Sequence, residues 1–203
     1  PNAVDLARFR PRGPLPPRPA RALLFSHYAA DHTHLPAVRE ACARAGLTLD
    51  VAGRASGNLC DRPEELLGAY DLVFAKARCA LEAMAVGCAV VLCDHAGTGP
   101  LVRADQWGAL RTLNFGRRTC ERPLTAGCLL EQVARYDPAD AAEVCLLTRT
   151  HAGVAAQVDE FLAVYGEAVR AQACAGTDPE YEARAAAEYL RTHLSYRWAT
   201  GLA

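Results

Sequence analysis

The chain has 203 residues, of which 51% are hydrophobic and 22% are charged, and its formal net charge is -1. This length suits one sizeable core with an appendage better than two full domains. A net charge near zero provides no basic field to hold a polyanion, so no nucleic-acid partner is expected.

The sequence carries no sign of a membrane segment or of a disulfide framework. No apolar stretch approaches the roughly 18 to 20 residues needed to cross a bilayer, and no basic segment followed by a hydrophobic one opens the chain. The nine cysteines are odd in number, dispersed, and never spaced as Cys-x-x-Cys. We therefore expect reduced thiols, no transmembrane segment and a cytoplasmic location.

The first twenty residues differ in composition from the rest of the chain. They contain six prolines with interspersed arginines. Proline disfavours both helix interiors and central strands. Residues 1–20 are therefore expected to form a linker or an extended lead-in.

From residue 21 onwards, short apolar runs alternate with segments rich in Ala, Leu, Glu and Arg. The runs of strand length are 22–26, 48–52, 71–75 and 88–93, and the helix-like segments between them are 35–45, 63–69 and 78–86. Strands that are apolar on both faces and alternate with helices indicate a parallel sheet covered on both sides. The sequence thus predicts an α/β, Rossmann-like, doubly wound domain.

The strand signal fades beyond Gly99, and only one further short strand is expected, around 110–115. Residues 126–194 are helical in composition, with breaks near Pro138, Gly153 and Pro179. The segment 180–194 is expected to be a separate terminal helix. We therefore expect the α/β domain to cover residues 21–172 and a helical tail to cover 173–203.

Candidate binding residues follow the predicted strands, because ligands of an open parallel sheet bind beyond the carboxyl ends of its strands. Lys76 and Arg78 fall where the helix 78–86 begins, and cations there oppose the positive end of the helix dipole. This placement favours a bound diphosphate, held by both cations and by the free amides of the first helical turn. The alternative is that both side chains simply extend into solvent at the sheet edge.

Glu82 lies one turn after Arg78 among Ala, Leu and Met residues. A carboxylate in such a setting is rarely buried without a partner. One explanation is an ion pair with Arg78, although Arg preceding Glu is the weaker order for such a pair. The other explanation is a ligand with two neighbouring hydroxyls, such as a ribose.

Two other segments carry residue types of functional interest. The sequence Gly-Thr-Gly-Pro at 97–100 follows a predicted strand, and glycines let a backbone approach a ligand closely, although a plain turn would also explain them. Residues 27–34 contain three histidines and one aspartate, but their spacing matches no zinc site, so no metal is expected. His27 is instead a candidate contact to phosphate or sugar. A Ser-His-Asp hydrolase is disfavoured because Gly-x-Ser-x-Gly is absent.

Several of these segments resemble a known family. Residues 1–11 resemble the Pro-Asn-Gly-Val-Asp-x-x-x-Phe-x-Pro segment that joins the two halves of family-4-type glycosyltransferases of the GT-B fold, with Ala3 replacing the usual glycine. Residues 65–75 and 80–91 resemble the family's run into its donor site, and Leu-Glu-Ala-Met-Ala-Val-Gly at 81–87 is the most specific part. A Gly-Gly-x-Pro-like loop is usual where residues 94–100 stand. The resemblance covers residues 1 to about 170.

The resemblance implies the donor-binding, C-terminal half of a GT-B glycosyltransferase, with residues 1–20 as the interdomain linker. It implies a nucleoside-diphosphate sugar as donor substrate, transfer with retention, no metal or other cofactor, and an N-terminal acceptor-binding domain as partner. Glu82 matches the second glutamate of the family's Glu-x7-Glu motif, which binds the donor ribose. Phe74 stands where the first glutamate of that motif is usual.

On this interpretation Lys76 and Arg78 are the expected catalytic residues, because they would stabilise the leaving diphosphate. The expected donor-binding residues are Ser26, His27, Arg54, Cys79, Glu82, Gly97, Thr98 and Gly99. Two alternatives stay open. The chain could be a non-catalytic nucleotide-sugar-binding or assembly module of a larger protein, which the missing first glutamate favours, or half of a sugar-nucleotide epimerase of the same two-domain fold.

Overall fold

The computed structural model describes residues 2–175 and 178–199 and contains a five-stranded sheet with the order β2-β1-β3-β4-β5. The strands are β1 (Arg21–Phe25), β2 (Thr48–Ala52), β3 (Leu72–Ala75), β4 (Ala89–Asp94) and β5 (Gly97–Leu101). The first four strands are parallel to one another, and β5 pairs with β4 in the antiparallel direction. The prediction of an α/β fold built on a mostly parallel sheet is confirmed.

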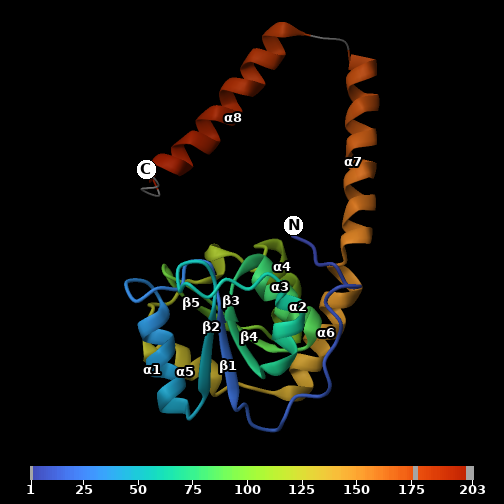
Figure 1. The fold of residues 1–203 in the computed structure, drawn as a ribbon. Helices are drawn as coiled ribbons and strands as arrows, with labels where there is room; N and C mark the ends of the chain where they lie inside the picture. Colours follow the sequence, from blue (N-terminus) through green and yellow to red (C-terminus); the bar gives the residue numbers. More distant parts are fainter. Residues whose placement is uncertain (1, 176–177, 200–203) are drawn as a thin grey trace. The chain divides into compact units, whose positions relative to one another are not determined.

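Helices cover both faces of this sheet, as Figure 1 shows. One face carries α1 (Leu35–Ala45) and α5 (Ala126–Val133), and the other carries α3 (Ala77–Val86) and α6 (Pro138–His151). The short helices α2 (Pro63–Leu66) and α4 (Trp107–Thr112) complete this part of the chain. Within β3, Leu72 and Phe74 belong to the hydrophobic core under α1 and α5, whereas Val73 and Ala75 belong to the core under α3. This alternation follows from the two-residue period of a strand and gives the domain two cores.

Two expectations for the middle of the chain were wrong. Residues 97–101, which include the Gly-Thr-Gly-Pro segment, form strand β5 and not a loop. The short strand expected around 110–115 is absent from the described chain, because Trp107–Thr112 form helix α4 and bury Trp107 and Leu110. The sheet is therefore extended by an antiparallel strand that the apolar pattern did not indicate.

The segment that precedes β1 packs closely on the domain. Val4 and Phe9 are only 2% and 4% exposed, and both belong to the core under α3. Arg149 of α6 donates hydrogen bonds to the carbonyls of Phe9 and Ala85, at 2.8 and 3.1 Å. The described part of residues 1–20 is thus anchored to α3 and α6 by buried side chains and by backbone contacts.

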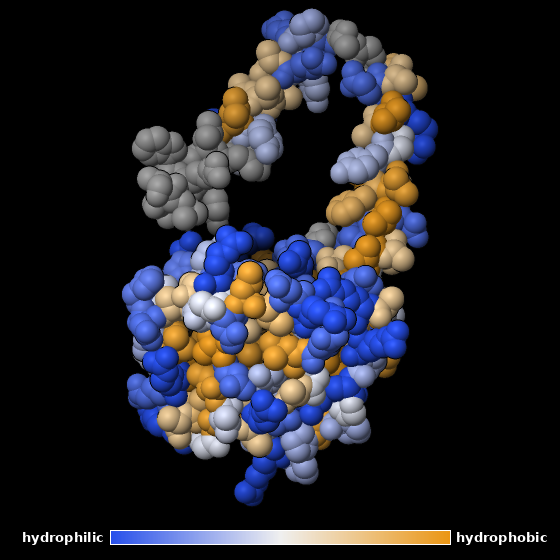
Figure 2. All heavy atoms as spheres, viewed as in Figure 1, coloured by the Kyte–Doolittle hydropathy of each residue, from blue (hydrophilic) through white to orange (hydrophobic). Residues whose placement is uncertain are grey.

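The chain divides into two compact units, Pro1–Gln157 and Val158–Ala203, so the division falls earlier than the expected boundary at residue 172. The second unit contains most of α7 (Val154–Ala175) and all of α8 (Pro179–Ala199). Within the expected tail of 173–203, residues 176–177 and 200–203 lie outside the described residues. Figure 2 shows hydrophobic side chains along α7, and those exposed there include Val158, Phe161, Leu162, Val164, Tyr165 and Val169. No helix among residues 2–175 and 178–199 combines the length and hydrophobicity that crossing a bilayer requires.

Candidate functional site

A cavity of about 480 Å³ opens beside the carboxyl end of β1 and the first turns of α3. Its charged and polar lining residues include Asp5, Arg8, His27, Arg78, Cys79 and Glu82. Four of the residues expected from the sequence, His27, Arg78, Cys79 and Glu82, are therefore brought together. The position agrees with the rule that ligands of an open α/β sheet bind beyond the carboxyl ends of its strands.

Glu82 projects into this cavity from α3 with a side chain that is 10% exposed. Its Oε1 atom lies 3.3 Å from Nε of Arg78, so the ion pair considered as an alternative is present. Burial raises the pKa of Glu82, and the positive charges of Arg78 and Arg8 offset only part of that effect. Glu82 is thus a poorly hydrated carboxylate that pairs with Arg78 through Oε1. Such a group is stabilised by any ligand that donates hydrogen bonds to it.

The N-terminal segment supplies a second cation to the same cavity. Arg8 Nη2 lies 2.9 Å from Oε2 of Glu64, which belongs to α2. Arg8 and Arg78 both line the cavity and each faces a carboxylate. Sequence reasoning did not find Arg8, because the proline content of residues 1–20 suggested an extended linker. The apolar residues Val4 and Phe9 on either side of Arg8 were the available signal that this segment is buried.

Cys79 also lines the cavity, next to Arg78. Burial raises the pKa of its thiol to about 11. The thiol is therefore protonated at neutral pH, so it can act as a weak hydrogen-bond donor and not as a nucleophile. Among the described residues, no group of three or more His, Cys, Asp or Glu side chains is arranged to hold a metal ion.

Lys76 does not line this cavity, although the sequence pointed to Lys76 and Arg78 facing one anion together. Its ammonium group forms an ion pair with Asp94 at the end of β4, and it lies 5.3 Å from the centre of the Tyr28 ring. The Asp94 side chain is fully buried. The two cations thus face different partners, since Asp94 neutralises Lys76 and Glu82 pairs with Arg78.

Helix α3 begins with an unusual backbone conformation. Ala77 has φ +50°, a left-handed backbone conformation that residues with a Cβ atom rarely adopt. Its amide donates a hydrogen bond of 2.7 Å to the carbonyl of Phe115, which also has a positive φ of 47°. No side chain caps this helix end. Two strained residues therefore hold each other in place at the edge of the cavity, as is common at binding sites.

The other expected donor-binding residues lie apart from the cavity. Ser26 is buried and its hydroxyl accepts the amide of Tyr28 at 3.3 Å, whereas Arg54 is exposed after β2. A Cβ atom on Gly97 would lie 2.6 Å from the carbonyl oxygen of Cys120, so this glycine permits close packing of two backbones. Gly99 and Thr98 line a separate hollow that β5 shares with residues 119–122 and with the end of α5.

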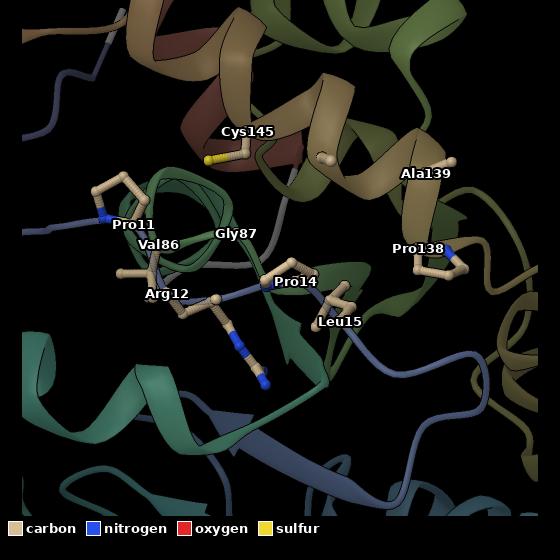
Figure 3. A pocket seen from close by; sticks show the side chains of 11 residues that line it. Pro11, Arg12, Pro14, Leu15, Val86, Gly87, Pro138, Ala139 and Cys145 are labelled. Carbon is tan, nitrogen blue, oxygen red and sulfur yellow. The ribbon is translucent and has the colours of Figure 1, made fainter.

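A further cavity of about 470 Å³ lies where α3 ends and α6 begins, and Figure 3 shows it from close by. It is lined mainly by apolar groups, among them Pro11, Pro14, Leu15, Val86 and Cys145. The guanidinium group of Arg12 is engaged by Asp71 at 3.2 Å. This cavity lies at the opposite end of α3 from Arg78 and lacks convergent polar groups, so it is the weaker candidate for a polar ligand.

The chain matches no model of a known protein family and no curated protein. The residues of the cavity beside α3 therefore carry the functional argument.

Proposed function

We propose that this chain is the donor-binding half of a GT-B-type glycosyltransferase and that it holds a nucleoside-diphosphate sugar in the cavity beside α3. The observation that carries the proposal is the convergence of Glu82, Arg78 and His27 on one cavity at the carboxyl ends of the strands. A carboxylate and a cation one turn apart are complementary to the two polar parts of a nucleotide, its ribose hydroxyls and its phosphates.

In this proposal Glu82 accepts hydrogen bonds from the two ribose hydroxyls. The carboxylate is buried, its pKa is raised by that burial, and Arg78 engages one of its two oxygens. Hydroxyl donors would offset the desolvation of the charged form without bringing a second positive charge into the cavity. The ribose therefore fits the chemistry of this group better than a phosphate does.

The diphosphate lies at the start of α3 and is neutralised by Arg78, with Arg8 as a second cation from the N-terminal segment. Both guanidinium groups now face carboxylates, so binding exchanges one anionic partner for another. The amide of Ala77 donates to the carbonyl of Phe115, but the amides that follow it in the first turn lack intrahelical partners and add hydrogen bonds to the phosphates. Negative charge develops on the diphosphate as the glycosidic bond breaks, and this is where the cations contribute to the rate.

Lys76 has a different part in this arrangement from the one that the sequence suggested. Its side chain is 24% exposed and is already paired with the buried Asp94. Arg78 is consequently the cation of α3 that serves the leaving group. The acceptor is bound mainly by an N-terminal domain, and no metal is required.

A non-catalytic nucleotide-sugar-binding module is the second candidate function, and one observation favours it. Phe74, at the position of the family's first glutamate, is fully buried in the core under α1 and α5. No carboxylate can therefore reach the sugar from that position. Such a module would bind the donor but would not release nucleoside diphosphate from it.

The proposal is tested by calorimetric titration of the whole chain with UDP, GDP and ADP and with their sugar conjugates. Hydrogen bonds to a charged group are worth about 1.5–3 kcal/mol. The substitution Glu82→Gln should therefore cost about 2 kcal/mol, or roughly 30-fold in dissociation constant. The matched control is Glu40→Gln, since Glu40 forms an i,i+4 pair with Arg44 on the surface of α1. Equal affinities for the wild type and the Glu82 variant, or no binding at millimolar ligand, would contradict the proposal.

A further inference from the structure

Helix α7 carries a stripe of exposed apolar side chains along one side. The stripe consists of Val158, Phe161, Leu162, Tyr165 and Val169, each of which is between 43% and 70% exposed. Their spacing is i, i+3, i+4, i+7 and i+11, so all five fall within about 100° of the helix surface. The rings of Phe161 and Tyr165 stack along the stripe with centroids 6.3 Å apart. An amphipathic helix normally buries such a stripe against a partner.

The rest of the surface of α7 is charged and mainly acidic. Asp159, Glu160, Glu167 and Arg170 are all exposed and fall outside the stripe. A helix that lies on a lipid surface carries Lys and Arg on its polar side, because the membrane surface is anionic. Three carboxylates and one guanidinium group therefore disfavour a membrane and favour a protein partner for the stripe.

Helix α8 does not offer a matching stripe among residues 179–192, whose side chains the structure describes. The large apolar residues exposed there are Tyr181, Tyr189 and Leu190. Tyr181 and Leu190 are nine residues apart, which places them on opposite sides of a helix. A hairpin of α7 and α8 would thus bury little of the stripe against apolar side chains.

The stripe is instead complementary to itself. Val158 and Val169 stand at its two ends, and an aromatic residue follows three or four positions inward from each. Two antiparallel copies would place Val158 on Val169 of the second copy at both ends, in a two-fold interface that closes on itself. The same orientation sets the end that carries Asp159 beside the end of the second copy that carries Arg170, whereas a parallel pair would bring the two acidic ends together.

The area of the stripe suits a weak dimer. At the observed exposures the five side chains offer about 400 Å² per copy, since a whole aromatic side chain buries about 150–250 Å². With Val164 and Ala168 on the rim, two copies would bury about 1,000 Å² in total, which is near the lower limit for a specific interface. An interface of this size forms reversibly and depends on protein concentration.

We propose that α7 is a self-association surface through which two copies of this chain form a weak antiparallel dimer. The inference goes beyond the function proposed above and does not depend on it. The first turn of α7 is held in place, because the amide of Val154 donates to the carbonyl of Val4 at 3.0 Å and Arg111 donates to Gln157 at 3.2 Å. The stripe begins directly after this turn, and packing of an apolar side is what stabilises most helices in proteins.

The test is sedimentation equilibrium of the whole chain between about 1 and 300 µM, a range that spans micromolar affinities. The average mass of the wild type should rise reversibly from 21.8 kDa towards twice that value. Leu162→Glu places a charge without a partner in the interface and should raise the dissociation constant of the dimer by about 10²- to 10³-fold. Ala163→Glu adds the same charge one residue further on, outside the stripe, and is the matched control that should leave the dimer unchanged. Circular dichroism checks that both variants keep their helical content.

A cross-linking experiment tests the antiparallel orientation. In an antiparallel pair residue 158 of one copy lies beside residue 169 of the other, whereas the two copies of residue 158 are eleven residues apart along the helix, or about 16 Å. A mixture of Val158→Cys and Val169→Cys chains should therefore form a disulfide-linked dimer in air. Each variant alone should form no more of this product than the wild type, which contains the native cysteines.

Three outcomes of these experiments would overturn the inference: a monomer at every concentration, equal dissociation constants for Leu162→Glu and the wild type, or cross-linking of each cysteine variant with itself in place of the other. A fourth is binding to vesicles of phosphatidylcholine and phosphatidylglycerol that Leu162→Glu abolishes, because the stripe would then serve a lipid surface.

Discussion

Replacing Ala77 by glycine should stabilise the fold, because Ala77 begins α3 with φ +50°. A left-handed conformation costs a residue with a Cβ atom roughly 1–2 kcal/mol, whereas glycine adopts it freely. Glycine also gives the unfolded chain more freedom, which costs about 0.4–1 kcal/mol. The two effects leave a net gain of about 1 kcal/mol in the free energy of unfolding.

Urea denaturation at pH 7 measures this gain directly, and thermal melting should show an increase of about 2–4 °C in the transition of a domain of this size. The matched control is Ala43→Gly, since Ala43 is an exposed residue in the interior of α1, where φ is negative. The control should lose about 1 kcal/mol. The opposite signs of the two variants separate backbone strain from helix propensity. If Ala77→Gly destabilises the protein as much as Ala43→Gly does, the strain argument is refuted.

The variant Ala77→Gly also tests whether the backbone strain at position 77 contributes to donor binding. Ala77 and Phe115 hold the first turn of α3 at the edge of the cavity through one backbone hydrogen bond of 2.7 Å. Glycine at position 77 would let that turn adopt other orientations, so its amides would be less well placed for a phosphate. We expect calorimetry to show weaker donor binding by the more stable variant. Unchanged affinity would mean that this strain has no part in the site.

Two further predictions concern packing and pH. A Cβ atom on Gly53 would lie 1.9 Å from the carbonyl oxygen of Ser26, so Gly53→Ala should lower the free energy of unfolding by about 3 kcal/mol. The control Gly68→Ala should change it little, because there is open space around Gly68. Similar urea midpoints for the two variants would contradict this prediction. Burial lowers the pKa of His34, so below about pH 6.5 the unfolded chain binds a proton that the folded chain does not, and stability falls as the pH decreases. The substitution His34→Leu should remove this contribution to the loss of stability between pH 7 and pH 5. If the free energy of unfolding of the variant changes with pH as steeply as that of the wild type, the assignment to His34 is refuted.

Hydrophobic patterning predicted most of the α/β core. The expected strand 48–52 and helix 35–45 coincide with β2 and α1, and the other three expected strands differ from the observed ones by a residue at one end or at both. These segments are buried on one or both faces, so the pattern of apolar residues is fixed by packing on the sheet. The breaks at Pro138, Gly153 and Pro179 also separate the observed helices, because proline and glycine interrupt helices for local steric reasons.

Strand β5 escaped prediction for a physical reason. Its sequence Gly-Thr-Gly-Pro-Leu contains two glycines and a proline, all of which are unfavourable in central strands. At the sheet edge the proline does not interrupt a ladder on both sides, and the glycines allow the backbone of 119–122 to lie against the strand. The ladder of this strand is formed with β4, which directly precedes it, and the backbone of 119–122 adds contacts from about twenty positions away that no local pattern reveals.

The presence of Arg78 and Glu82 in the cavity was predictable from the sequence. The position of Lys76 was not, and the reason is physical. The helix dipole disfavours a cation at the start of α3 by only a few tenths of a kcal/mol, and on that basis Lys76 and Arg78 were together expected to face one anion. The same sequence pattern placed Lys76 and Asp94 at the carboxyl ends of two consecutive parallel strands, about 5 Å apart in a sheet. An opposite charge at that distance in a partly buried position is a stronger influence on a lysine than the end of a short helix. Pairing residues across adjacent strand ends before assigning ligands would have left Arg78 as the cation available to the cavity.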